Sequence, residues 1–287
     1  MNAVRIIPRL DIKGPDLVKG IHLEGLRVLG KPQEFARYYY ENNADELIYQ
    51  DVVASLYERN SLHEIITRTA REIFIPLTVG GGIRTLEDIT SVLRAGADKV
   101  AINTAALKNP DLIRKSAERF GSSTIVISIE LIKEKDNRYF AYTDNGREHT
   151  GVEVISWAKQ VEELGAGEII LTSVDREGTG DGFDNDLVEK VSKAVTIPVI
   201  AHGGAGKMQD VQEIFNSGAD AVSIASMFHY NTIDNLKKVS VEEAEGNVEF
   251  LKSKKGFAKV ESTSINELKT YLDKQNINCR LNGEAKI

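Results

Sequence analysis

The sequence predicts an α/β protein of the (β/α)8 TIM barrel class, and three observations support this prediction. Short runs of β-branched residues alternate with helix-length amphipathic segments along the 287 residues. Eight such β-α units fit within about 250 residues, the usual length of this barrel. No G-x-G-x-x-G turn follows an early strand, as the alternative of an open doubly wound sheet would require.

Each of the eight units begins with an expected strand and continues with a helical pattern. The strands are expected at 5–11, 46–51, 77–80, 99–103, 124–130, 168–172, 198–202 and 221–225. Two of the helical patterns, LEDITSVLRAG and MQDVQEIFNSG, end in a glycine that suits a helix C-cap. We expect residues 1–287 to form a single barrel domain.

Composition excludes several classes of protein. The chain is 41% hydrophobic and 28% charged, with a net charge of −7 and no long block of like charge, so we expect neither a nucleic-acid nor a membrane partner. The start, MNAVRIIPRL, has too short an apolar run for a signal peptide, and we expect a cytoplasmic protein. The five histidines and Cys279 show no metal-ligand spacing, so we predict no metal and no other cofactor.

The chain also matches itself. The segment GGGIRTLEDITSVLRAGADKVAINTAAL, from Gly80, overlays HGGAGKMQDVQEIFNSGADAVSIASMF, from His202, without a gap. NADELIYQDV overlays GAGEIILTSV at the same sequence offset. RIIPRLD overlays TIVISIE at an offset that is shorter by three residues. The sequence therefore predicts two half-barrels of four units each, related by internal duplication.

The duplication pairs two carboxylates. Asp11 and Glu130 fall at equivalent positions, each closing the first strand of its half. Barrels of this class build their active sites at the carboxyl ends of the strands, so the two acids would face one mouth as an acid–base pair. The alternative is that each caps a neighbouring helix or pairs with a lysine such as Lys13.

Glycine-rich turns repeat in the same way and suggest two anion sites. Exposed backbone N–H groups at such turns bind phosphate when a helix N-terminus lies behind them. One site in each half predicts a long ligand with a phosphate at each end, although the glycines could simply allow tight turns. The residues expected at these sites are Gly81, Gly82, Asn103, Thr104, Gly178, Gly203, Gly204, Ala225 and Ser226.

Further polar residues should surround the same mouth. The loop Asp175–Thr179 follows the sixth strand and is expected to cover the mouth, and Lys19 could add a cation. The other substrate contacts are expected from Lys19, Asp51, Thr172, Asp175 and Glu177.

The opposite end of the barrel carries a charge pattern of its own. Two cations and two anions stand at the starts of strands one, two, four and six: Arg5, Glu46, Lys99 and Glu168. They could form a ring of salt bridges that either stabilises the barrel bottom or gates a passage through it. The residues alone favour stabilisation.

Together these motifs closely resemble the cyclase subunit of imidazole glycerol phosphate synthase. The resemblance rests on RIIPRLDIKG, DLVKG, VGGGI, GADKVAINTAA, GAGEIILTS, DREGTGDGFD, GGAGK and a terminal INELKTYLDKQNINCRL. It covers about residues 1–230 and resumes near Ser264. It implies a (β/α)8 barrel that pairs with a glutaminase subunit docked on the barrel bottom.

The resemblance also implies a reaction. Ammonia from the glutaminase would cross the barrel and react with a bisphosphate, N'-phosphoribulosyl-formimino-AICAR-phosphate, giving imidazole glycerol phosphate and AICAR for histidine and purine synthesis. Asp11 matches one catalytic aspartate of the family, the four charged residues match its ammonia gate, and the turns match its two phosphate sites.

Five residues depart from the family pattern, the first being Pro8 where an alanine is usual. Glu130 replaces the second catalytic aspartate, Arg9 stands where a cysteine is usual, His202 replaces a serine, and Glu177 replaces an aspartate. Glutamate reaches one methylene further than aspartate, and a displacement of about 1 Å can cost ~100-fold in rate. Arg9 could face outward between the strand and a helix, or inward, where it would pair with Asp11 or Glu130 and hold that carboxylate ionised. Because Arg9 and Asp11 share a face if the strand is regular, we expect the inward orientation.

Residues 231–263 are longer than the family's connection at this point and are expected to form an insertion before the last helix. It would be either a solvated helix or hairpin, or a docking element for a partner.

Two other functions remain open at this stage. The first is a paralogous barrel that passes ammonia to a third protein, an amidotransferase of surface-polysaccharide (acetamidino sugar) synthesis. The second is the related single-chain isomerase, which would have no use for the four-charge layer.

Overall fold

The computed structural model describes residues 3–54, 62–236 and 259–281. Eight parallel strands form the barrel: β1 (Arg5–Lys13), β4 (Leu47–Asp51), β5 (Leu77–Gly80), β6 (Lys99–Ile102), β7 (Ile125–Lys133), β10 (Glu168–Ser173), β11 (Val199–His202) and β12 (Ala221–Ile224). Each pairs with the next, and the pairings of β7 with β10 and of β12 with β1 close the ring. The predicted TIM barrel is confirmed, with strand bounds shifted by three residues at most.

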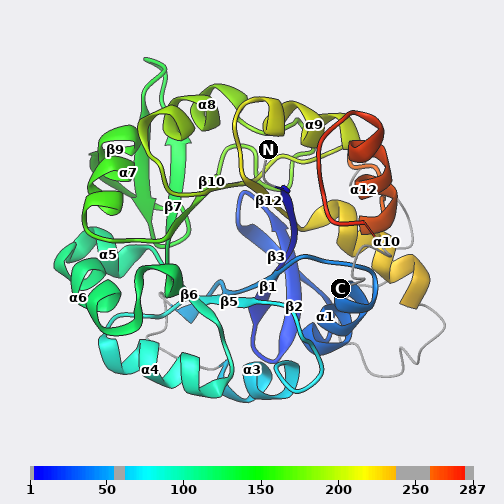
Figure 1. Cartoon of the computed structure of the whole chain (residues 1–287), viewed down its shortest axis with the longest axis horizontal. Coiled ribbons are helices and arrows are strands. Elements are labelled where there is room, and N and C mark those ends of the chain that lie inside the picture. The colour runs from blue at the N-terminus through cyan, green and yellow to red at the C-terminus, as the bar shows by residue number, and fades with distance from the viewer. Residues whose placement is uncertain (1–2, 55–61, 237–258, 282–287) are drawn as a thin grey trace.

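Helices surround the strands as an outer ring (Figure 1). They are α1 (Pro32–Glu41), α3 (His63–Thr69), α4 (Leu86–Ala95), α5 (Thr104–Lys108), α6 (Asp111–Phe120), α7 (Val154–Glu163), α8 (Asn185–Ala194), α9 (Met208–Asn216), α10 (Ser226–Leu236) and α12 (Ile265–Lys274), with a 3-10 turn at Ser122–Thr124. Their apolar faces are buried against the outer face of the strands in one large core.

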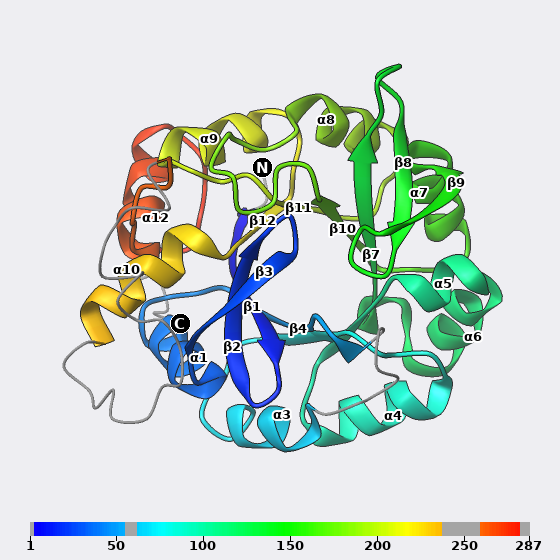
Figure 2. The same ribbon diagram turned by 180° about the vertical axis from the view of Figure 1, so that it is seen from behind.

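Two antiparallel hairpins extend the barrel and were not predicted. In the first half β2 (Asp16–Ile21) pairs with the end of β1 and with β3 (Glu24–Gly30). In the second half β8 (Tyr139–Thr143) pairs with the end of β7 and with β9 (Glu148–Glu153). Both hairpins are visible in Figure 2. Because the first strand of each half carries one, they are a further sign of the duplication.

Local geometry repeats between the halves as well. Gly81 and Gly203 adopt φ of +99° and +97°, in the left-handed region that favours glycine. A Cβ at Gly81 would lie 2.3 Å from the Asp51 carbonyl oxygen, and one at Gly203 would lie 2.6 Å from that of Ser173. Both glycines are thus required by a close approach to the preceding strand, whatever they bind.

The barrel interior is layered. A small apolar cluster fills its middle: Ile7, Ile48, Ala101, Val126, Ile170, Ile200 and Ala221. Side chains two residues apart on a strand share a face, so the residues two positions earlier form the layer below, which contains Arg5, Glu46, Lys99 and Glu168. The residues two positions later form a polar layer above: Arg9, Gln50, Asn103, Ser128, Thr172, His202 and Ser223.

The C-terminal segment closes the ring of helices next to the N-terminus. Lys269 on α12 is buried and its Nζ donates to Asp45 Oδ1 at 2.7 Å, while the Val4 amide donates to the Asn278 carbonyl at 2.8 Å. Most of the insertion expected at 231–263 falls outside the described residues, so its fold and the single-domain extent of the chain stay predictions. No helix in the described ranges is long and apolar enough to cross a bilayer.

Candidate active site

Arg9 points into the barrel and pairs with Asp11, as expected. Its Nε donates to Asp11 Oδ1 at 2.8 Å, and its Nη1 donates to Thr172 Oγ1 at 3.3 Å. The exposed fractions of Arg9 and Asp11 are 4% and 2%. In the ring of strands β11 and β12 lie between β10 and β1, so the guanidinium crosses part of the barrel interior to reach Thr172.

This pairing fixes the charge of Asp11. Burial alone would raise the pKa of Asp11, but the positive charges of Arg9 and Lys19 outweigh burial and hold this pKa below its ordinary value. Asp11 is therefore ionised at neutral pH, and its remaining lone pairs can accept a proton.

Glu130 has the opposite electrostatic setting. It is 7% exposed, and burial raises its pKa to about 7 although Arg9 acts against this shift. One oxygen, Oε2, accepts a hydrogen bond from the Gly146 amide at 3.0 Å. The same guanidinium thus acts on both acids, and they titrate in different pH ranges, as a proton donor and a proton acceptor should.

A cavity of about 320 Å³ opens at the carboxyl ends of β4, β5, β6 and β7. Six of the residues predicted for the site line it: Asp51, Gly81, Gly82, Asn103, Thr104 and Glu130. None of its lining residues comes from β1, β10, β11 or β12. Of the two predicted catalytic acids, then, Glu130 lines this cavity and Asp11 does not.

The cavity also contains residues that sequence reasoning missed. Arg84 and Lys108 supply two cations near the first predicted phosphate turn, and Asp144 and Asn145 reach the cavity from the turn between β8 and β9. Arg84 is held in place by a hydrogen bond from Nη2 to the Ala54 carbonyl oxygen at 3.1 Å. The Asp144-Asn145-Gly146 run is a hairpin signal, and recognising that hairpin would have brought these residues to the mouth.

The second half of the mouth is covered. Lys19 Nζ forms a buried ion pair with Glu177 Oε1, and Glu177 Oε2 accepts from the Leu23 amide at 3.2 Å. The His22 amide donates to the Glu177 carbonyl oxygen at 2.9 Å. These bonds fasten the β2–β3 hairpin to the loop after β10. The positive charge of Lys19 is consequently already neutralised by Glu177.

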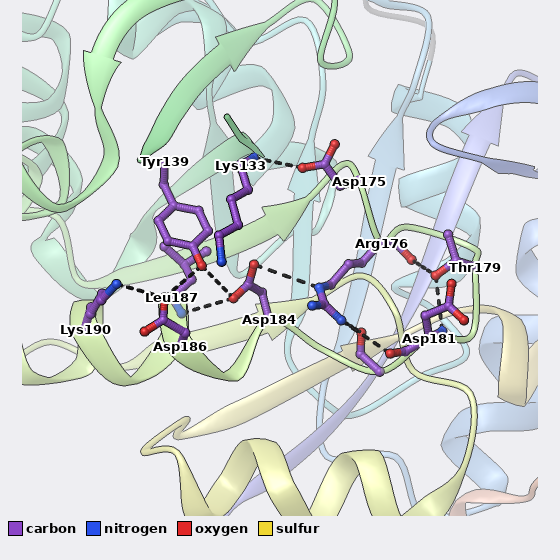
Figure 3. Close-up of polar contacts among 11 residues, drawn as sticks. Lys133, Tyr139, Asp175, Arg176, Thr179, Asp181, Asp184, Asp186, Leu187 and Lys190 are labelled. Carbon is purple, nitrogen blue, oxygen red and sulfur yellow. Dashed lines mark hydrogen bonds and ion pairs between the residues drawn. The ribbon is translucent and has the colours of Figure 1, made fainter. Parts of the chain in front are cut away.

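The loop after β10 lies at the carboxyl end of that strand and is held by its own hydrogen bonds (Figure 3). Asp175 Oδ2 accepts from the Lys133 amide at 2.8 Å, so this carboxylate faces β7. Arg176 Nη1 donates to the carbonyl oxygens of Asp181 and Gly182 at 3.3 and 3.1 Å, and Thr179 Oγ1 donates to the Arg176 carbonyl at 2.8 Å. This frame fixes the position from which Glu177 reaches Lys19.

The other predicted residues of the second half are buried beside this loop. Thr172, Ala225 and Ser226 are 0%, 5% and 7% exposed. A Cβ at Gly178 would lie 2.8 Å from the Gly20 carbonyl oxygen, so this glycine packs on the β2–β3 hairpin. The second set of predicted turns therefore lies at the same barrel end as the first, under the hairpin and loop.

His202 is a neutral acceptor in the polar layer. Its Nδ1 donates to the Ser223 carbonyl oxygen at 2.8 Å, which leaves Nε2 unprotonated. Burial, with help from Arg9, lowers its pKa to about 3. His202 adjoins the second glycine turn, and in this state its Nε2 can only accept a hydrogen bond. It therefore supplies neither a positive charge nor a donor to a phosphate bound there.

The four charged residues at the bottom form the predicted ring of salt bridges. Arg5 Nη1 lies 2.7 Å from Glu46 Oε1 and 2.9 Å from Glu168 Oε1, and Lys99 Nζ lies 3.1 and 3.0 Å from the same two carboxylates. Burial lowers the pKa of Arg5, but Glu46 and Glu168 outweigh it, so the guanidinium stays charged. The ring closes the barrel interior below the apolar layer.

Comparisons with known proteins agree on one family. A family model described as histidine biosynthesis protein matches residues 5–234. The imidazole glycerol phosphate synthase subunit HisF of Legionella pneumophila is 60% identical over 210 residues, which cover 73% of this chain and 99% of that protein.

Two further relatives carry the same name. HisF of Lactococcus lactis is 49% identical over 237 residues, covering 81% of this chain and 92% of that protein. HisF of Streptomyces griseus is 46% identical over 243 residues, covering 84% of this chain and 97% of that protein.

Proposed function

Since this chain belongs to the histidine biosynthesis protein family, we infer that it is the cyclase subunit of an imidazole glycerol phosphate synthase. The observation that carries this inference is the 60% identity to a named HisF over most of the chain, together with two buried carboxylates at the barrel mouth. The chain is thus a lyase subunit of histidine biosynthesis. We propose the cytoplasm as its location.

The proposed reaction combines ammonia with N'-phosphoribulosyl-formimino-AICAR-phosphate and releases imidazole glycerol phosphate and AICAR. We propose that a glutaminase subunit docks on the barrel bottom and delivers ammonia there. The ring of Arg5, Glu46, Lys99 and Glu168 would gate its entry. Support comes from the position of this ring, which lies at the opposite end from the two acids.

Asp11 and Glu130 divide the proton transfers between them. Asp11, kept ionised by Arg9, is the proton acceptor of the pair. Glu130 has a pKa of about 7, so it can donate a proton to the leaving amine as the C–N bond breaks. A proton donor is most effective when its pKa lies near the working pH. The pKa of Glu130 meets this condition, whereas the lowered pKa of the ion-paired Asp11 does not.

One phosphate of the substrate would bind in the open cavity at Gly81, Gly82, Asn103 and Thr104. Arg84 and Lys108 line the same cavity and supply positive charge. The second phosphate would bind at the turns with Gly203, Gly204, Ala225 and Ser226, once the hairpin and loop held by Lys19 and Glu177 separate. The remaining contacts proposed are Asp51, Thr172, Asp175 and Gly178.

The comparisons give no support to the alternative of a conduit that feeds a third protein. The isomerase alternative lacks a reason for the ring of four charges, which the structure contains.

The test is turnover of purified chain with ammonium chloride and the bisphosphate substrate. We expect turnover, and we expect Asp11→Asn to abolish it and Glu130→Gln to reduce it by about 100-fold or more. Glu130→Asp is the matched control, since it keeps the carboxylate and moves it by one methylene. Absence of turnover in the unaltered chain, unrelieved by Glu130→Asp, would contradict the cyclase function.

A further inference from the structure

The two sides of the barrel mouth differ in how deep they are open. On one side the cavity extends down to Ala101, a member of the apolar layer, and Ser128 and Asn103 line its wall above that layer. On the other side Arg9, Thr172, His202 and Ser223 fill the polar layer, all with at most 4% exposure.

Arg9 causes this asymmetry. Its guanidinium reaches from β1 to Thr172 on β10, above the apolar layer, and its Nε is bound by Asp11. The two strands between β10 and β1 in the ring, β11 and β12, contribute no residue to the cavity. A small molecule that rises through the apolar layer therefore meets a buried, charged side chain on this side and open volume on the other.

Accordingly, we propose that ammonia rises from the barrel interior past Ala101 and Ser128, along the inner faces of β6 and β7, and enters the cavity beside Glu130 rather than beside Asp11. This proposal rests on the proposed function, in which ammonia crosses the barrel. The apolar layer contains two alanines, Ala101 and Ala221, and its other members are isoleucine and valine. The constriction is therefore widest where an alanine stands. Neutral ammonia can pass an apolar constriction that would exclude an ammonium ion.

The chain offers a matched control for this route. Ala101 and Ala221 belong to the same apolar layer and are 3% and 0% exposed. Ala101 lies on β6 and lines the cavity, whereas Ala221 lies on β12, on the side that Arg9 covers. Adding the same two methyl groups at either position gives a similar overpacking cost.

The first experiment compares Ala101→Val with Ala221→Val in the complex with the glutaminase. Turnover is measured with glutamine and, separately, with ammonium chloride, which can enter from the mouth. For Ala101→Val we expect the ratio of glutamine-dependent to ammonium-dependent turnover to fall about tenfold. For Ala221→Val we expect this ratio to stay within twofold. A fall at Ala221 instead, or an equal fall at both, would overturn the route.

The second experiment does not need turnover. Ala101→Cys and Ala221→Cys are treated with methyl methanethiosulfonate, and mass spectrometry follows modification against the background of the buried Cys279. We expect Cys at 101 to react at least tenfold faster than Cys at 221. Equal rates would overturn the proposed opening even if the enzyme is active. If the unaltered complex is inactive with both nitrogen sources, the proposed function fails, and these rates still decide the geometry.

Discussion

Arg9 Nε lies 2.8 Å from Asp11 Oδ1 inside the barrel, and the two side chains are only 5% and 3% exposed. The residue that the family resemblance leads one to expect at position 9 is an uncharged cysteine. The arginine therefore changes what Asp11 can do, because it keeps this carboxylate ionised and also acts on Glu130.

Replacing Arg9 by methionine should destabilise the protein strongly, because Asp11 would remain buried without its cation. We expect a loss of about 3–5 kcal/mol in the free energy of unfolding at pH 7. Urea denaturation at several pH values measures it. The loss should shrink towards pH 4, where Asp11 can become neutral. The double variant Arg9→Met/Asp11→Leu should recover part of the loss, and a double variant less stable than Arg9→Met would contradict this explanation.

Glu130 should make stability depend on pH in a defined window. Its folded pKa of about 7 lies above the ordinary value of about 4.3, so folding favours the neutral form. The stabilisation from that form is complete below pH 4.3 and is lost as pH rises to about 7.

The measurement compares the unaltered chain with Glu130→Gln, in which this group cannot titrate. Relative to the variant, the free energy of unfolding of the unaltered chain should decrease between about pH 4 and pH 7 and level off above. A difference that is independent of pH would show that Glu130 has an ordinary pKa. The same titration predicts that turnover declines above about pH 7, as Glu130, the proposed general acid, loses its proton.

Shortening Glu177 to aspartate should loosen the β2–β3 hairpin. The shorter side chain withdraws the carboxylate from Lys19 and from the Leu23 amide. We expect at least tenfold faster hydrogen exchange at the His22 and Leu23 amides, measured by mass spectrometry of peptides from the hairpin. Glu24→Asp is the control, since Glu24 lies on the same hairpin but its side chain is 63% exposed. Its ion pair with Arg147, at 3.5 Å, lies at the surface. Equal rates of hydrogen exchange in both variants would contradict the conclusion that Glu177 holds the hairpin in place.

Gly203→Ala should cost more than its backbone conformation alone explains. Its φ is +97°, and a Cβ would meet the Ser173 carbonyl oxygen at 2.6 Å. Gly151 has φ of +73° with nothing within 4 Å of a Cβ, so Gly151→Ala isolates the backbone cost, about 1 kcal/mol. Thermal or urea unfolding of both variants should show a further loss of at least 1 kcal/mol for Gly203→Ala. Similar losses would mean that the close approach relaxes easily.

Much of this architecture was readable from residues alone because it repeats. The barrel strands were found to within a few residues, since each is a short β-branched run followed by a helical pattern. The inward orientation of Arg9 followed from its spacing to Asp11. Both hairpins were missed because they extend strands that the eight-unit count had already used.

Other parts of the site depend on distances that no local pattern encodes. The pairing of Lys19 with Glu177 joins positions 158 apart in the sequence. Their spacing predicts that both lie at the mouth, but it does not predict that they form an ion pair with each other. For the same reason the sequence predicted two equivalent anion sites, whereas in the structure one predicted set of residues lines an open cavity and the other set is buried.

The apolar layer between the two charged ends has a consequence for proton accounting. Moving an ion from water into a medium of low polarity costs on the order of 20 kcal/mol in the idealised limit, so a single band of isoleucine, valine and alanine side chains works as a dielectric filter. In the proposed reaction, ammonium would have to lose its fourth hydrogen before this layer, on the side of Glu46 and Glu168. The two proposed catalytic acids at the mouth would then exchange only the protons of the reaction itself.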